Sequence, residues 1–261
     1  MKIDKKFKGL KNVGWRYEYE GNIVTEKALE VDLGMRLYVS GSIEAGESIE
    51  AGESIEAGGY IEAGGYIEAG GYIKAGWSIE AGEYIKAGGY IEAGGYIEAG
   101  ESIKAGGYIK AGGYIKAGGY IKAGGYIKAG ESIEAGGYIK AGESIEAGGY
   151  IEAGWYIEAG WYIEAGGSIE AGGSSGISAG LSITCRGTLT FGLKCFAGVC
   201  AWREITEEEK IITCGKLEGG VIEYGILVET GLDNDKKKEL LKKADQLIKK
   251  AEELKKEAER L

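Results

Sequence analysis

The stretch from Gly58 to Gly76 reads GGYIEAGGYIEAGGYIKAG, and the same six-residue phrase returns through most of the chain. Isoleucine occupies position 43 and every sixth position through Ile169, which gives 22 consecutive units without an insertion. We number each unit from its Ile: position two is Glu in 14 units and Lys in 8, position three is always Ala, and position four is always Gly. Position five is Gly, Glu or Trp, and position six is Tyr or Ser. A fixed short period of this kind predicts a repeat architecture.

The period of six favours short β-strands over helices, because a helix repeats every 3.6 residues and tolerates Gly poorly. Alternate side chains of a strand share a face, so Ile and Ala are expected to point inward and Glu or Lys outward. We expect Gly at position four to end each strand by adopting the positive φ of a corner. Stacked coils would bury a continuous Ile and Ala column and pair each backbone with the next coil. The sequence therefore predicts a mainly β fold, a parallel β-helix (β-solenoid) of hexapeptide repeats.

The apolar, polar, apolar, small order extends beyond the perfect units. It is kept upstream by Val31-Asp32-Leu33-Gly34 and, after a two-residue slip, downstream by Cys195-Phe196-Ala197-Gly198. Three units per turn would give roughly ten turns and a rod of about 45–50 Å, whereas two units per turn would give a longer rod; the handedness stays open. We predict an N-terminal cap at 1–24, the solenoid at 25–200 with its perfect units at 43–174, and a β-rich C-terminal cap or module at 201–232.

The last segment, 233–261, is built almost wholly of Lys, Glu, Leu and Ala. Asp233 and Asp235 offer an N-cap, and the apolar residues that follow step by four and three, as in a heptad seam. The sequence predicts one amphipathic C-terminal α-helix whose seam self-associates, meets a designed partner or packs on its own chain. This predicted helix association seam consists of Leu240, Ala244, Leu247, Ala251, Leu254, Ala258 and Leu261.

The composition restricts the chemistry and the partners of the protein. The net charge of −10 disfavours nucleic acid and anionic membranes as partners. No run of about 18 apolar residues is present and the first residues lack an apolar signal segment, so we expect a cytoplasmic protein. The chain has no His, which removes the usual general base and His metal ligands. We therefore expect no enzyme activity, no catalytic residues, no metal and no cofactor.

The four cysteines give no metal-binding pattern, because none of them forms the C-x2-4-C knuckle typical of zinc sites. Cys185 and Cys195 fall in the inward columns of the repeat. For Cys185, Cys195, Cys200 and Cys214 we favour buried structural thiols over a metal site or a disulfide.

Outward positions supply the candidate contact residues. Fourteen Tyr at position six are expected to form ladders along the rod, which either stabilise the coil edge or bind a glycan by stacking. Lys at position two clusters in the middle of the chain, and is either a solvated surface or an electrostatic patch for a partner. Trp at position five is harder to explain without a contact role. The predicted partner contacts are Trp77, Trp155, Trp161, Lys104, Lys110, Lys116, Lys122 and Lys128.

Two parts of the chain resemble different classes of protein. Units such as Ser-Ile-Glu-Ala-Gly-Glu resemble hexapeptide-repeat hypothetical proteins of Firmicutes and their phages, a likeness that implies a β-solenoid and no agreed activity. The Gly-x-Ile-x-Ala rhythm is similar to that of bactofilins, which polymerise end to end. Hexapeptide acyltransferases are less similar, because they place a small residue where this chain has Gly, Glu or Trp, and they use a His. Residues 233–261 resemble a de novo designed helix, which suggests a chimera.

These patterns predict a non-catalytic structural scaffold or binding rod, used as an engineered assembly building block. One alternative is a phage-derived inhibitor that binds a host protein through its charged and aromatic solenoid surface. Another is a glycan-binding rod that uses its Tyr ladders.

Overall fold

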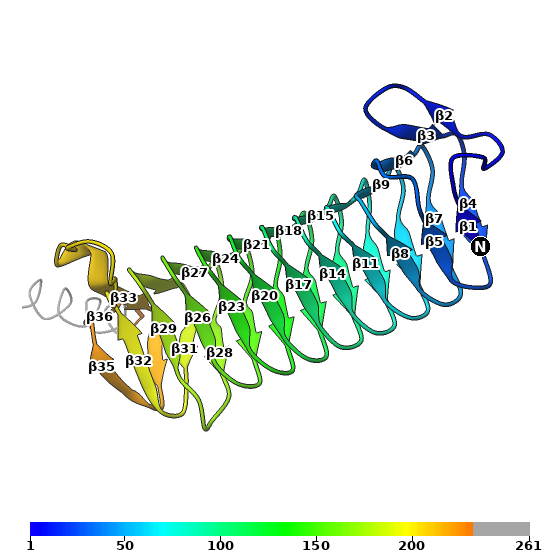
Figure 1. Cartoon of the computed structure of the whole chain (residues 1–261). Coiled ribbons are helices and arrows are strands. Elements are labelled where there is room, and N and C mark those ends of the chain that lie inside the picture. The colour runs from blue at the N-terminus through cyan, green and yellow to red at the C-terminus, as the bar shows by residue number, and fades with distance from the viewer. Residues whose placement is uncertain (232–261) are drawn as a thin grey trace, which may run out of the picture.

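The computed structural model describes residues 1–231, which form one rod of stacked β coils (Figure 1). Each coil contributes one short strand to each of three sheets, so strands three apart in the chain are neighbours. Ile61, for example, pairs in parallel with Ile43 on one side and with Ile79, 18 residues on, on the other. Three units therefore make one turn, and the predicted parallel β-solenoid is confirmed.

The three sheets, which we call A, B and C, run the length of the rod. The strands of sheet A, in spatial order, are β1 (Lys2–Ile3), β5 (Leu29–Val31), β8 (Ile49–Ala51), β11 (Ile67–Ala69), β14 (Ile85–Ala87), β17 (Ile103–Ala105), β20 (Ile121–Ala123), β23 (Ile139–Ala141), β26 (Ile157–Ala159), β29 (Ile177–Ala179), β32 (Lys194–Ala197) and β35 (Val221–Tyr224).

Sheet B begins with an antiparallel hairpin of its first two strands. Its strands are β2 (Lys11–Asn12), β3 (Tyr17–Tyr19), β6 (Leu37–Val39), β9 (Ile55–Ala57), β12 (Ile73–Ala75), β15 (Ile91–Ala93), β18 (Ile109–Ala111), β21 (Ile127–Ala129), β24 (Ile145–Ala147), β27 (Ile163–Ala165), β30 (Ile183–Cys185), β33 (Ile211–Cys214) and β36 (Ile226–Glu229). A short 3-10 helix, η1 (Glu208–Lys210), precedes β33.

Sheet C completes the triangular coil. Its strands are β4 (Ile23–Thr25), β7 (Ile43–Ala45), β10 (Ile61–Ala63), β13 (Ile79–Ala81), β16 (Ile97–Ala99), β19 (Ile115–Ala117), β22 (Ile133–Ala135), β25 (Ile151–Ala153), β28 (Ile169–Ala171), β31 (Thr188–Thr190) and β34 (Lys216–Glu218).

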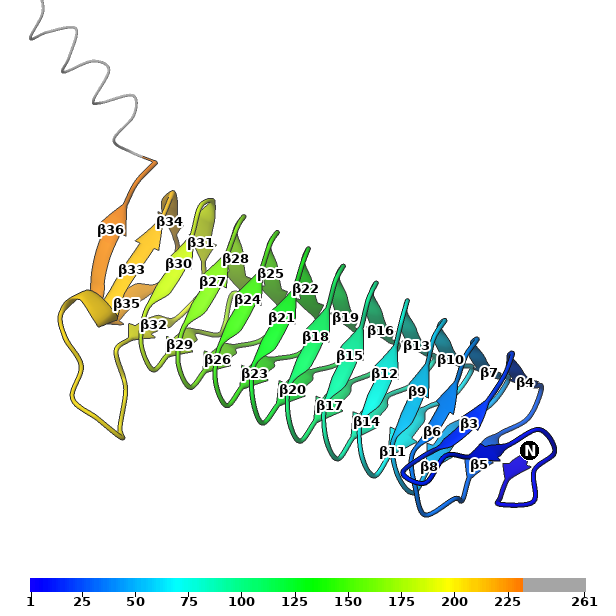
Figure 2. The ribbon, with the colours of Figure 1, turned by 90° about the horizontal axis from the view of Figure 1, so that it is seen from above.

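The rod is somewhat longer than the sequence predicts, because strands near both ends of the described chain join the same sheets. The 12 strands of sheet A are separated by 11 spacings of about 4.8 Å, which corresponds to roughly 53 Å, against a predicted length of about 45–50 Å. Residues 1–25 already supply β1, β3 and β4 to the three sheets, and residues 211–229 supply β33 to β36. Between β32 and η1 the chain leaves the stack as a loop that projects from the side of the rod (Figure 2).

The core consists of the two predicted inward columns. Each Ile of the perfect units is fully buried, and each Ala of position three is at most 7 % exposed. Cys185, Cys195 and Cys214 continue these columns and are buried, as expected, whereas Cys200 is half-buried in the projecting loop. Burial raises the pKa of both the Cys185 and the Cys195 thiol to about 12, so these two side chains stay protonated and unreactive at neutral pH.

The reason predicted for the invariant Gly at position four is wrong. Within the perfect units no residue has a positive φ; the positive-φ glycines lie near the two ends of the described chain. The actual constraint is close stacking of the corners. A Cβ on Gly76 would lie 2.1 Å from the carbonyl oxygen of Gly58 in the coil below, while its N–H donates to the Ala57 carbonyl over 2.9 Å. Position five is less crowded where position six of the coil below is Tyr, since a Cβ on Gly107 would find its nearest neighbour at 3.5 Å; where that residue is Ser, a Cβ on Gly71 would meet the Ser54 hydroxyl at 2.1 Å. That space explains why Glu and Trp occur there.

The predicted C-terminal helix and its association seam, in 233–261, lie outside the described residues. Within residues 1–231, no helix has the length and apolar character that a transmembrane span requires.

Candidate functional site

The outer faces of the three sheets differ in the charge carried at position two. Because three units make one turn, every third unit adds its charged residue to the same face. Sheet C is almost entirely acidic, with one lysine, Lys116, between Glu98 and Glu134. Sheet B mixes both signs. Sheet A separates them, and this separation makes its outer face the candidate binding surface.

Four lysines follow one another on consecutive coils of sheet A, a series that we call the basic ladder. It consists of Lys86, Lys104, Lys122 and Lys140. Stacked strands bring their Cα atoms within about 5 Å, so these ammonium groups repel one another and together attract an anion.

Carboxylates close the basic ladder at its two ends. The Nζ of Lys86 lies 2.6 Å from a Glu68 oxygen, and that of Lys140 lies 2.7 Å from a Glu158 oxygen. These hydrogen bonds raise the pKa of both lysines. The inner lysines, Lys104 and Lys122, form no ion pair with any residue of the described chain. The positive charge that is available to a partner is therefore concentrated in the middle of the ladder.

The structure distributes the five predicted lysines over all three faces. Lys104 and Lys122 lie on sheet A, Lys110 and Lys128 on sheet B, and Lys116 on sheet C. The basic middle expected from the linear sequence is thus not one patch. Lys86 and Lys140, which the sequence analysis did not select, complete the ladder of sheet A.

Tyrosines at position six stack into ladders, as expected. Neighbouring rings are parallel, with centroids 4.7–5.0 Å apart, for instance Tyr120 with Tyr138 and Tyr138 with Tyr156 on sheet A. Each ring leans toward position two of the coil below. Where that residue is Glu, the phenol usually donates to it, as from Tyr108 to Glu92 over 2.9 Å. Since one ring covers the face of the next, the ladders have little free aromatic surface for stacking a sugar.

The three tryptophans are exposed at corners of the coil. Trp155 lies two residues before strand β26 and Trp161 two residues after it, so they occupy the two corners that border sheet A in one coil. Trp77 lies between sheets B and C. Trp155 and Trp161 are 60 % and 44 % exposed, which leaves both indoles accessible next to the end of the basic ladder. Trp77 is far from them on a different corner.

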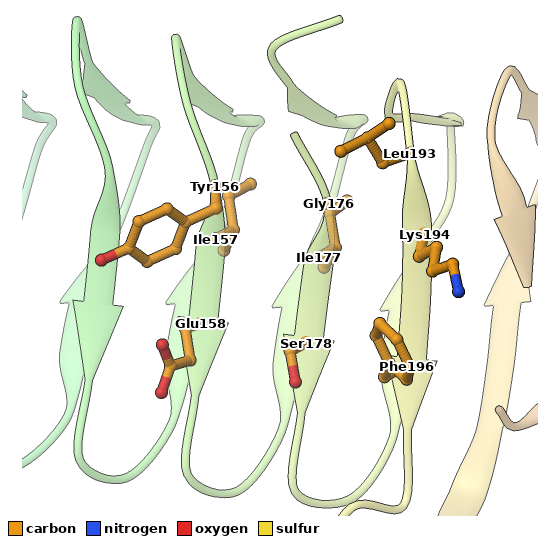
Figure 3. A pocket seen from close by; sticks show the side chains of 9 residues that line it. All are labelled: Tyr156, Ile157, Glu158, Gly176, Ile177, Ser178, Leu193, Lys194 and Phe196. Carbon is orange, nitrogen blue, oxygen red and sulfur yellow. The ribbon is translucent and has the colours of Figure 1, made fainter. Parts of the chain in front are cut away.

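An apolar pocket of about 310 Å³ lies on sheet A, where Tyr156, the residue that follows Trp155, is part of its lining (Figure 3). It forms because Gly176 stands where a tyrosine would continue the ladder and because Phe196 replaces a charged residue at position two. Glu158, Ser178 and Phe196 follow one another across β26, β29 and β32. We call this the end pocket; its lining is Tyr156, Ile157, Glu158, Gly176, Ile177, Ser178, Leu193, Lys194 and Phe196.

Sequence reasoning missed the end pocket, although a signal was present. Phe196 was assigned to a regular unit, yet it is an aromatic residue at a position that is charged in all the perfect units. Leu193, a second apolar residue of the lining, is 57 % exposed. The sequence alone did not place it beside Phe196 and Gly176, because the slip in the repeat leaves the alignment of these coils open. The basic ladder and the end pocket together give sheet A one face with positive charge and an apolar recess.

Among residues 1–231, no three Cys, Asp or Glu side chains converge in the way a metal ion requires. The buried thiols face the core. Comparison with known proteins gives no match: no family model, no curated protein and no solved structure matches this chain.

Proposed function

We propose that the protein is a non-catalytic binding rod that holds an acidic protein partner on the outer face of sheet A. The observation that carries this proposal is the basic ladder, in which four lysines on consecutive coils stand in a protein of net charge −10. Like charges so close together cost folding free energy, and an opposing acidic surface would recover it. The end pocket and Trp155 supply the apolar contacts that interface anchors need.

Three alternative roles differ in the surface that they would use. In the first, which follows from the resemblance to hexapeptide-repeat proteins of Firmicutes and their phages, the rod is a phage-derived inhibitor and the partner on sheet A is a host protein. An engineered assembly block would instead associate through the seam in 233–261. The glycan-binding alternative has less support, because the tyrosine rings cover one another.

Charge reversal on two faces tests the proposal. The double variant Lys104→Glu/Lys122→Glu changes sheet A, and Lys110→Glu/Lys128→Glu makes the same change in net charge on sheet B. A partner captured stoichiometrically from a bacterial lysate by the unaltered chain should be reduced at least tenfold by the first variant and retained by the second, about a 1.4 kcal/mol discrimination. Equal capture by both variants would contradict the assignment to sheet A.

Light scattering separates binding from assembly. If the seam in 233–261 self-associates, the mass in solution falls when the chain ends at residue 232, while capture through sheet A persists. An unchanged monomer mass in both chains removes the assembly role.

A further inference from the structure

One rung of the tyrosine ladder is missing on sheet A, beside the first two lysines of the basic ladder. Ser102 occupies position six there, with Tyr84 one coil below and Tyr120 one coil above. The absent ring leaves a hollow of about 240 Å³. Its lining consists of Tyr84, Ile85, Lys86, Ser102, Lys104 and Tyr120.

The intact rungs show how a ring would lie in this hollow. A tyrosine at position six extends over the coil below, and its phenol oxygen reaches position two of that coil, as Tyr114 reaches Glu98 over 2.8 Å. The residue in that place below Ser102 is Lys86, and Lys104 stands beside it on the next strand. A ring in the hollow would therefore stack between Tyr84 and Tyr120, with its para substituent at the two ammonium groups.

The polar groups around the hollow favour an anionic substituent at that end. Lys104 has no ion-pair partner in residues 1–231, whereas Lys86 forms an ion pair with Glu68 and can offer only part of its charge to a ligand. The Ser102 hydroxyl likewise has no hydrogen-bond partner in the described chain, while the Ser48 hydroxyl accepts from the Tyr66 N–H over 3.3 Å. Glu83 and Glu101 are exposed at the preceding corners, which disfavours an anionic group at the opposite end of the ring.

Other serine rungs have the same shape without this charge. At Ser132 the flanking rings are Tyr114 and Tyr150, but the position-two pair is Lys116 with Glu134, whose charged atoms are 3.9 Å apart. The hollows at Ser48 and Ser168 are lined by two glutamates each. Among the serine rungs of 42–174, Ser102 is the one with lysine on both coils.

We propose that the Ser102 hollow binds a small aromatic anion, a single ring that carries a phosphate or another anionic group at one end. The ring replaces the missing rung of the tyrosine stack, and the anion binds Lys86 and Lys104. This site goes beyond the proposed protein partner and does not depend on it, because it needs only the Ser102 coil and the coil on either side.

Phenyl phosphate titrated into the full chain, followed by ligand-detected NMR, tests the site. A ligand of this size in an open hollow should bind with a Kd on the order of 1 mM. Ser102→Tyr restores the repeat and fills the hollow, so binding should be lost while the fold is kept. Lys104→Gln should weaken binding at least fivefold, and the matched variant Ser132→Tyr should leave it unchanged.

A rescue sharpens the test. Adding Glu134→Lys to Ser102→Tyr gives the Ser132 rung lysine on both coils and should restore binding of phenyl phosphate. The proposal is overturned if Ser102→Tyr binds as well as the unaltered chain, if inorganic phosphate binds as tightly as phenyl phosphate, or if 10-fold the expected Kd, about 10 mM, gives no binding.

Discussion

The outer faces of sheets A and C share one backbone, one spacing and one Ile and Ala core, yet they present opposite surfaces. Sheet A carries four consecutive lysines and an apolar recess, and sheet C carries glutamates with one lysine among them. The strands of the two sheets are alike: β17 of sheet A (Ile103–Ala105) and β16 of sheet C (Ile97–Ala99) each have three residues, of which the first and third are buried. The difference teaches that the inward positions fix the fold, while position two can change its charge without altering the coil.

The contrast between inward and outward positions is tested most strongly by placing a charge at an inward position of a strand. Ile103→Asp puts a carboxylate where the side chain is fully buried, and should destabilise the fold by more than about 4 kcal/mol. Lys104→Asp, the next residue, should change stability by less than about 0.5 kcal/mol because its side chain is exposed. Thermal unfolding followed by circular dichroism compares the two. A similar loss in both would refute the separation of core and surface.

A methyl group at a stacked corner should have the next largest effect. Gly100→Ala would bring a Cβ to 2.0 Å from the Gly82 carbonyl oxygen, so the corners must move apart, at a cost of about 2–3 kcal/mol. At Gly113 the nearest atom to an added Cβ is 3.5 Å away. Gly113→Ala should therefore leave the melting temperature unchanged or raise it slightly. If Gly113→Ala is the more damaging change, close stacking is not the reason for the invariant Gly.

Removing one phenol hydroxyl compares rungs above glutamate with rungs above lysine. Tyr108→Phe loses a 2.9 Å hydrogen bond to Glu92 and should cost about 1 kcal/mol. Tyr126, whose rung lies above Lys110, makes no phenol hydrogen bond within the described chain, so Tyr126→Phe should be nearly neutral. Chemical denaturation measures both, and equal losses would show that the hydroxyls contribute by solvation alone.

The smallest expected effect concerns the pH dependence of the acidic face. Desolvation, with Glu80 and Glu44 on the neighbouring coils, raises the pKa of Glu62 in the folded state. A raised carboxyl pKa means that ionisation destabilises the fold; this penalty is present at neutral pH and disappears as the pH falls through the raised pKa toward 4.5. Glu62→Gln should be more stable by about 0.3 kcal/mol at pH 7, with no difference near pH 4.

Glu134→Gln is the control for that pH effect on the same sheet. Glu134 accepts a hydrogen bond from Tyr150 and lies 3.9 Å from Lys116, so the substitution removes favourable contacts and should not stabilise the protein. A gain of stability at pH 7 in both variants would show that general net charge, and not the stacking of glutamates, is responsible.

Much of the fold follows from the spacing of the sequence, but the candidate site does not. Ile and Ala at sixfold spacing are sufficient to predict which side chains are buried. Whether Lys104 lies in line with Lys116 or with Lys122 depends on two or three units per turn, a global quantity that one unit does not contain. The role of Gly was misassigned for the same reason, since its closest contact is 18 residues away. Phe196 and Gly176 create a pocket only when the slip brings both residues into the lining of one recess.

The triangular cross-section also ties the length of the repeat to the layout of the surface. Gain or loss of three units at once adds or removes a whole turn and keeps every downstream column in line. A change of a single unit rotates everything that follows by one side of the triangle, so a unit gained or lost between β23 and β26 would move the end pocket off the face of the basic ladder. Within the perfect units, a gain or loss of repeats that keeps the surface intact is therefore expected in multiples of three units, the 18 residues that separate stacked partners such as Ile61 and Ile79.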